Sequence, residues 1–238
     1  MKVLGIDTAT LTESAAIVID GAVAALSEIR TSTHSDRLLP LCAEVLAGVG
    51  LGAADLDAIA VGAGPGSFTG LRIGMATAKG LAFALGTPLW AVSSLAALAD
   101  DAQVAAGTIV VPILDARRGE VYAGAFRRDG DALVALGPER VLPPADLAAM
   151  IAAVAGDGAG VALLGDGLDA HAAALATLDP AYARLVDARR TPSAAAVARL
   201  ALAGDRVDHL VDGAPAYVRP SEAEVKYPGG VPGALRRP

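Results

Sequence analysis

The 238-residue sequence contains a single cysteine, Cys42, and few aromatic side chains. One thiol cannot form an intrachain disulfide, so we expect a reducing compartment, the cytoplasm. Only 3% of the residues are aromatic, whereas 54% are hydrophobic, mostly alanine, valine and leucine. This composition predicts a core of small, closely packed aliphatic side chains.

The sequence also has no excess of basic residues: its formal net charge is −7. This charge argues against a nucleic-acid binder that works alone, since such proteins usually carry a basic stripe. Four arginine pairs, at 117–118, 127–128, 189–190 and 236–237, are interpreted as solvated surface charge, with a local patch as the alternative.

The three histidines, His34, His171 and His209, are too scattered to place two imidazoles one helical turn apart, so no metal site is expected. Residues 80–99 carry no charge and reach the nominal length of a membrane span, but Gly86-Thr87-Pro88 interrupts them. Neither a membrane segment nor a signal peptide is expected.

Two similar hairpin units are present along the chain. Asp7 ends an apolar run and precedes Asp20-Gly21 by thirteen residues, while Asp115 precedes Asp129-Gly130 by fourteen. Asp-Gly between two strand-like runs is a strong hairpin signal. The similar spacing predicts an internal duplication.

Each hairpin unit is followed by alternating helices and strands, which indicates an α/β fold with mixed sheets. We expect a lobe over residues 1–105, a second lobe over 106–228 and a loose tail over 229–238. The main helices are expected at residues 36–48, 71–85, 95–104, 144–155, 168–178 and 193–203.

Residues 62–74, GAGPGSFTGLRIG, resemble a phosphate-binding loop at first sight. However, the glycines do not fit the dinucleotide fingerprint, and no lysine is present for a P-loop. Pro65 also lacks the backbone N–H that a phosphate cradle would use. Neither common phosphate motif is therefore present.

Small residues recur in the helix that follows. Gly70, Gly74 and Ala78 are spaced four apart, with Ile73 and Thr77 beside them. Such a face allows another backbone to approach closely. The approaching segment belongs either to the same chain or to a partner.

Residues 62–82 closely resemble the signature of the TsaB (YeaZ) family, accessory proteins of bacterial tRNA threonylcarbamoyladenosine (t6A) synthesis. Further matching segments lie at residues 6–10, 34–40, 92–95, 115–122 and 215–219. The resemblance covers nearly the whole chain. It implies an actin/hexokinase-like (ASKHA) fold of two duplicated lobes, each a mixed sheet with a hairpin unit and flanking helices.

The resemblance also implies a non-catalytic role. TsaB-like chains form a heterodimer with TsaD, which transfers a threonylcarbamoyl group to N6 of adenosine 37 in tRNAs reading ANN codons. A small ATPase, TsaE, completes the assembly, and tRNA is met through the complex. ATP or ADP and any metal are accordingly expected in the partner subunits rather than in this chain.

The pairing implied by the resemblance uses helices of the first lobe. Gly74→Leu would then block the heterodimer and leave the monomer folded, and the same face would support a homodimer when the partner is absent. The interface residues expected on this basis are Leu38, Leu39, Gly70, Ile73, Gly74, Thr77 and Ala78.

An alternative function is an ATP-dependent phosphotransferase or hydrolase of the actin/hexokinase class. Asp7 would contact hydrated Mg²⁺, and Thr8 or Thr10 would hydrogen-bond a phosphate. Capping of the strand end by Asp7 is the favoured interpretation. Asp115 is followed by Ala-Arg-Arg without a glycine, so the site is only half formed. Its residues would be Asp7, Thr8, Thr10, Asp115, Gly165 and Gly167.

A peptidase has little support. Cys42 with His34 is a conceivable thiol–imidazole pair, but Cys42 lies on the apolar side of its predicted helix, as expected of an inert thiol. Residues 66–70 have one residue too many for a nucleophile elbow.

Overall fold

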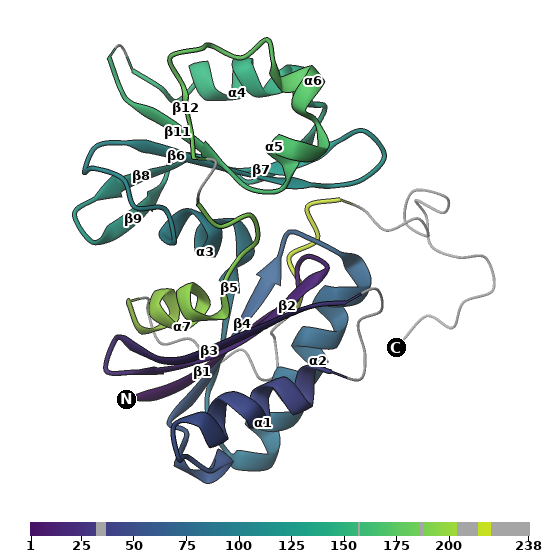
Figure 1. Cartoon of the computed structure of the whole chain (residues 1–238), viewed down its shortest axis with the longest axis vertical. Helices are drawn as coiled ribbons and strands as arrows, with labels where there is room; N and C mark the ends of the chain where they lie inside the picture. Colours follow the sequence, from purple (N-terminus) through teal and green to yellow (C-terminus); the bar gives the residue numbers. More distant parts are fainter. Residues whose placement is uncertain (32–36, 157, 186–187, 204–213, 220–238) are drawn as a thin grey trace, which may run out of the picture.

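The structure, a computed structural model, describes residues 1–31, 37–156, 158–185, 188–203 and 214–219. It has two lobes, each built on one β-sheet (Figure 1). His34, His209 and the tail expected over residues 229–238 lie outside the described residues. Within those ranges, no helix has the length and hydrophobicity needed to cross a bilayer.

The first lobe contains a five-stranded sheet in the order β3-β2-β1-β4-β5. β1, β2 and β3 form an antiparallel meander, and β4 and β5 continue it in parallel. Asp20 and Gly21 both have positive φ, 50° and 86°, which confirms the predicted hairpin turn. The strands are β1 (Lys2–Asp7), β2 (Thr12–Ile19), β3 (Ala22–Arg30), β4 (Ala58–Gly64) and β5 (Leu89–Ser93).

Two helices, α1 (Leu38–Gly48) and α2 (Phe68–Leu85), cover one face of this sheet. The Ser67 side chain accepts a hydrogen bond from the Gly70 N–H at 3.2 Å and so caps α2 at its start. Gly86 ends α2 in the left-handed conformation, with φ of 65°. A short 3₁₀ turn, η1 (Ala53–Asp55), leads from α1 towards β4.

The second lobe contains a seven-stranded sheet with β6 at its centre. The extended segment after the turn at residues 116–120 is divided into β7 and β8, and the break falls at Gly124-Ala125. Its strands are β6 (Ile109–Asp115), β7 (Val121–Ala123), β8 (Phe126–Asp129), β9 (Ala132–Ala135), β10 (Arg140–Leu142), β11 (Val161–Leu164) and β12 (Ala183–Arg184). Its helical segments are η2 (Pro144–Asp146), α4 (Leu147–Ala152), α5 (Gly167–Ala170) and α6 (Ala172–Leu175).

The remaining two helices cross between the lobes. α3 (Ser94–Asp100) packs Leu98 into a buried cluster with residues of β6 and β8 in the second sheet. α7 (Ala194–Ala203) packs Val197 against β1, β2 and β4 of the first sheet. The expected assignment of all residues from 106 to 228 to the second lobe is therefore wrong, because the apolar face of α7 covers the first lobe.

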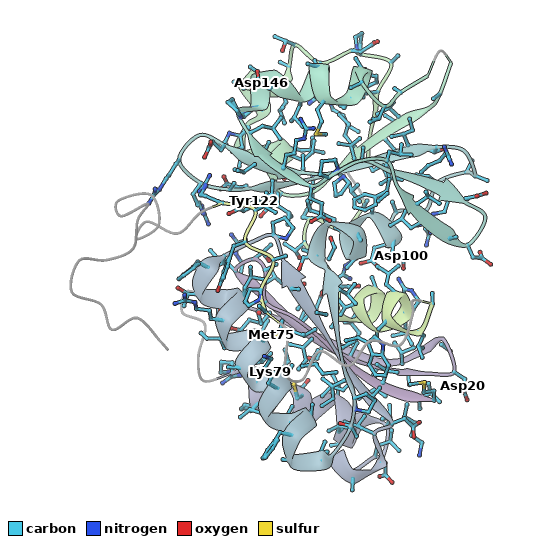
Figure 2. The ribbon with its side chains drawn as sticks, turned by 180° about the vertical axis from the view of Figure 1, so that it is seen from behind. Asp20, Met75, Lys79, Asp100, Tyr122 and Asp146 are labelled. Atoms are coloured by element: carbon cyan, nitrogen blue, oxygen red, sulfur yellow. The ribbon has the colours of Figure 1, made fainter. Side chains whose placement is uncertain are left out.

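A cluster of ion pairs holds these crossed helices together. Asp100, at the end of α3, accepts hydrogen bonds from Arg128 of β8 at 3.2 Å and from Arg199 of α7 at 3.0 Å. Arg199 also contacts Asp101 at 3.0 Å. Figure 2 shows Asp100 in the region between the two lobes. Arg128 is buried, so its loss would remove one of the two arginine partners of Asp100 at the lobe junction.

The small-residue face of α2 lies inside the first lobe. Gly70, Gly74 and Ala78 are buried, and the Thr8 hydroxyl donates to the Gly70 carbonyl at 2.8 Å. A Cβ at Gly74 would stand 2.3 Å from Thr8 Oγ1. The segment that approaches this face is therefore the turn after β1 of the same chain, at Thr8. The expectation that these three residues form a partner interface is wrong, and Gly74→Leu would not leave the monomer intact.

Two glycines of α2 give a matched test of this packing. Gly74→Ala should lower the free energy of unfolding by about 1–3 kcal/mol, because the new methyl group overpacks the contact with Thr8. Gly80→Ala, which would meet nothing within 4 Å, should raise it by about 0.5–1 kcal/mol through helix propensity. Urea unfolding of both variants measures the difference, and equal stabilities would contradict this packing.

Candidate functional site

Asp7, the first residue of the expected nucleotide site, is enclosed at the end of β1. Its Oδ2 accepts a hydrogen bond from Ser94 Oγ at 2.7 Å, and its Oδ1 accepts one from the Ala9 N–H at 2.9 Å. A Cβ at Gly62 would be only 1.9 Å from Oδ2, so β4 closes the remaining side. This geometry favours the strand-capping alternative. Burial raises the pKa of Asp7 from 3.8 to about 6.

Gly165 and Gly167, the glycines of the expected nucleotide site, pack against the sheet of their own lobe. A Cβ at Gly165 would be 2.1 Å from the Ile113 carbonyl oxygen, and one at Gly167 would be 2.7 Å from the Ile113 side chain. Gly165 also has a φ of 113°, which L side chains rarely adopt. Both glycines are thus explained by the close approach of β6.

Asp115, at the end of β6, lies in a polar cluster that the sequence did not reveal. Its Oδ1 lies 3.1 Å from His171 Nε2, and its carboxylate pairs with Arg117 at 3.2 Å. Its backbone N–H donates to Asp166 Oδ1 at 3.0 Å, and burial raises the pKa of Asp166. Among the described residues, no group of three or more side chains is arranged to hold a metal.

A cavity of about 1230 Å³ separates the two lobes. Of the expected nucleotide residues, Thr10 and Asp115 line this cavity, whereas Asp7, Thr8 and both glycines do not. The walls come from residues 9–12 between β1 and β2, Arg30 at the end of β3, the start of α2, the turn after β6, the segment around α5, and residues 190–191 and 216–219.

Residues 214–219 run across this cavity from one lobe to the other (Figure 1). The Ala216 N–H donates to the Ala63 carbonyl of β4 at 2.7 Å. On the opposite side, Arg219 donates to the Ala116 carbonyl at 2.8 Å and pairs with Glu120. Tyr122, beside this segment in Figure 2, lies 5.7 Å below the Arg219 guanidinium. The segment therefore fastens the lobes to each other.

An aromatic contact anchors this segment on the first lobe. The rings of Tyr217 and Phe68 lie 5.0 Å apart, and Arg72 stacks on Phe68 at 3.8 Å. Arg72 Nε also donates to the Tyr217 hydroxyl at 3.0 Å. In the sequence, residues 215–219 stand out only as a matching segment, because the partners of Tyr217 are distant in the chain.

The outer surface of α1 and α2 is a second candidate site. Leu39 is 56% exposed and Phe83 is 79% exposed, whereas Leu38 is buried and does not belong to the surface. Ile73 and Thr77 are half-buried. The further exposed apolar residues of the two helices are Pro40, Ala43, Ala47, Gly48, Phe68, Ala76, Gly80 and Ala84.

Residues 26–162 match the family model described as TsaD: tRNA N6-adenosine threonylcarbamoyltransferase. The chain is 43% identical over 130 residues to the tRNA threonylcarbamoyladenosine biosynthesis protein TsaB of Escherichia coli. That match covers 54% of this chain and spans little more than half, 56%, of the relative.

Two solved structures are similar over most of the chain. YeaZ from Pseudomonas aeruginosa is 32% identical with a TM-score of 0.78, over 91% of this chain and 99% of that one. A dehydratase activator from Clostridium difficile, solved with bound ADPNP, has a TM-score of 0.50 at 11% identity, over 85% of this chain and 95% of that one. This second likeness concerns the fold alone, and with it the predicted actin/hexokinase-like class is confirmed.

Asp7 should make the stability of the protein depend on pH. Between about pH 4 and pH 6 the folded chain keeps a proton on Asp7 that the unfolded chain releases, so stability falls as pH rises through this window. The loss is on the order of 2–3 kcal/mol. Asp7→Asn removes this titration and should gain stability relative to the wild type across the same window, as measured by urea unfolding.

Asp131→Asn, at an exposed turn residue, is the control and should follow the wild-type profile. Parallel profiles for the wild type and Asp7→Asn would show that the Asp7 carboxyl is not enclosed as described.

Proposed function

Because the chain belongs to the TsaB (YeaZ) family, within the TsaD-type family whose model it matches, we propose that it acts in t6A biosynthesis. The proposed role is that of a non-catalytic partner of a TsaD-like threonylcarbamoyltransferase, required for modification of N6 of adenosine 37 in tRNAs reading ANN codons. The observation that carries this proposal is the match to YeaZ over 91% of the chain.

The contacts of the aspartates that end β1 and β6 support a non-catalytic role. The Asp7 carboxylate uses its two oxygens on Ser94 and Ala9, and Asp115 is engaged by His171 and Arg117. Residues bound in this way hold strand ends in place. We therefore assign ATP or ADP, and any metal, to the TsaD-like subunit and to a TsaE-like ATPase.

The outer surface of α1 and α2 is the proposed docking site for the TsaD-like subunit. Exposed helix faces are normally polar, yet only Glu44, Thr69 and Arg72 are polar among the exposed residues of these two helices. Phe83 and Leu39 are the large side chains of this surface. Burial of exposed aromatic and aliphatic groups is the usual source of affinity at an interface. The same surface would support a homodimer when the partner is absent.

The alternative function, an ATP-dependent phosphotransferase or hydrolase acting alone, is favoured by one observation. Thr10 of the first lobe and Asp115 of the second lobe both line the cavity. Nucleotide turnover by the isolated chain would support this alternative and would contradict the non-catalytic role.

The docking site can be tested with the double variant Leu39→Asp/Phe83→Asp. Two charges on the apolar surface should raise the Kd for the TsaD-like subunit at least tenfold, because a docked carboxylate would be desolvated without a partner. Calorimetry and size-exclusion chromatography with light scattering measure the association.

Val134→Asp is the matched control, since Val134 is an exposed apolar residue of β9 in the second lobe. It should leave the Kd unchanged. Equal weakening by both variants, with both monomers folded, would place the interface elsewhere.

The function is tested by t6A formation on a cognate tRNA. The reaction contains the TsaD-like enzyme, the small ATPase and the adenylate-forming enzyme, with and without this chain. Product is expected only when the chain is present, and the Leu39→Asp/Phe83→Asp variant should not restore it. Product formed equally without the chain would overturn the accessory role.

A further inference from the structure

The exposed aromatic side chains of this protein gather at one helix. Aromatic residues make up only 3% of the sequence, and most of those described are buried or half-buried. Among the described residues, the exposed ones are Phe68 at 39%, Tyr217 at 41% and Phe83 at 79%. Phe68 and Phe83 lie near the two ends of α2, and the Tyr217 ring packs against Phe68 with 5.0 Å between the centroids. Exposed aromatic groups concentrated in this way indicate an interaction surface.

The exposed residues of α2 form a stripe that leads to Tyr217. Phe68, Arg72 and Ala76 are exposed and follow one another at intervals of four residues, so they lie on one side of the helix. Tyr217 continues this stripe at the amino end of α2, because its ring packs on Phe68. The apolar surface of α1 and α2 thus extends onto residues 214–219, which belong to neither helix.

Arg72 places a positive charge at this junction. Its guanidinium lies 3.8 Å from the centroid of the Phe68 ring, and its Nε donates to the Tyr217 hydroxyl at 3.0 Å. Among the described residues, its partners are this hydroxyl and the two aromatic rings, and none of them is a carboxylate. The remaining N–H groups of an exposed guanidinium held in this way are directed to acceptors from outside the chain.

Residues 214–219 are fixed in place by both lobes (Figure 1). The Ala216 N–H donates to a carbonyl of β4 at 2.7 Å, and Arg219 donates to the Ala116 carbonyl of the second lobe at 2.8 Å. Tyr217 lies between these two anchors, so its ring has a defined position before a partner arrives. A preorganised side chain loses little conformational entropy on docking, and more of its contact energy then contributes to affinity.

We propose that the docking surface for the TsaD-like subunit continues past the start of α2 onto residues 214–219, with Tyr217 as an anchor and a partner carboxylate bound to Arg72. This inference rests on the proposed function, because the same partner occupies the outer surface of α1 and α2. An arginine covered by an apolar partner would lose its hydration without compensation, so the partner must supply an anion there. Tyrosine and arginine are also enriched among the residues that dominate interface affinity.

The charge pattern favours this heteromeric partner over a second copy of the chain. Glu44 is the only carboxylate in α1 and α2. Its Oε1 already accepts a hydrogen bond from the Ser27 hydroxyl at 3.0 Å. The same surface of a second copy could therefore answer Arg72 only with a carboxylate that is engaged elsewhere.

Calorimetry of the full chain with the TsaD-like subunit tests this extension. Tyr217→Ala removes the aromatic anchor and Arg72→Gln removes the charge, and each should raise the Kd at least tenfold. Tyr217→Phe keeps the ring and loses only the hydroxyl, so it should weaken binding less than Tyr217→Ala. Arg127→Gln makes the same charge change at an exposed position of β8 and should bind like the wild type.

The salt dependence of binding separates a contact from a structural role. Rising ionic strength should weaken the wild type more steeply than Arg72→Gln, because only the wild type has a charge pair across the interface. Equal salt dependence of the two proteins would overturn the proposal. Arg72→Gln changes an exposed side chain, so it remains decisive even where Tyr217→Ala loosens residues 214–219.

The remaining outcomes distinguish this proposal from the proposed function. Wild-type affinity in both Arg72→Gln and Tyr217→Ala, with weak binding by Leu39→Asp/Phe83→Asp, would overturn the extension and leave the proposed function in place. Weakened self-association of Arg72→Gln with unchanged binding to the TsaD-like subunit would overturn it in favour of a second copy. Absence of any wild-type association with the TsaD-like subunit would overturn both.

Discussion

The crossing of α3 and α7 is the constraint on which the rest of this structure depends. α3 follows β5 of the first lobe but packs on the second sheet, whereas α7 follows β12 of the second lobe but packs on the first sheet. The two helices meet between the lobes. Asp100 and Asp101 bind Arg128 and Arg199 at this junction. Buried ion pairs of this kind add little net stability, but removal of one partner is costly, so they specify one arrangement of the lobes. The cavity and the position of residues 214–219 both follow from that arrangement.

Local features of the fold could be predicted from the sequence, whereas the pairing of distant surfaces could not. Asp20-Gly21 predicts the first hairpin because the turn chemistry is contained in two residues. The periodicity of residues 194–203 predicts an apolar helix face, but it carries no information on which sheet that face covers. In the same way, Gly70 and Gly74 predict a close backbone approach without identifying Thr8, in the turn after β1, as the residue that approaches.

The candidate sites also depend on residues that are distant in the sequence. The arginines that line the cavity range from Arg30 to Arg219, and each looks like an ordinary surface charge in its own stretch of sequence. These arginines come together because the cavity has walls from both lobes. For Asp7 the sequence predicts too much. Its position at the end of an apolar strand predicts a ligand-binding carboxylate, but in the structure Ser94 and Gly62 enclose its side chain. α2 connects the two regions of interest: Phe68 lies at the cavity and Phe83 on the outer surface, a helical span of about 22 Å.

The position of α7 in the chain also has a consequence for synthesis on the ribosome. The first sheet is complete once β5 ends at Ser93, yet the helix that covers one of its faces begins at Ala194. At typical elongation rates this interval lasts roughly 5–20 s. During that time the apolar side of the nascent sheet, including Val3, Val18 and Trp90, lacks its native cover. The first lobe therefore needs chaperone protection or delayed folding until α7 has emerged.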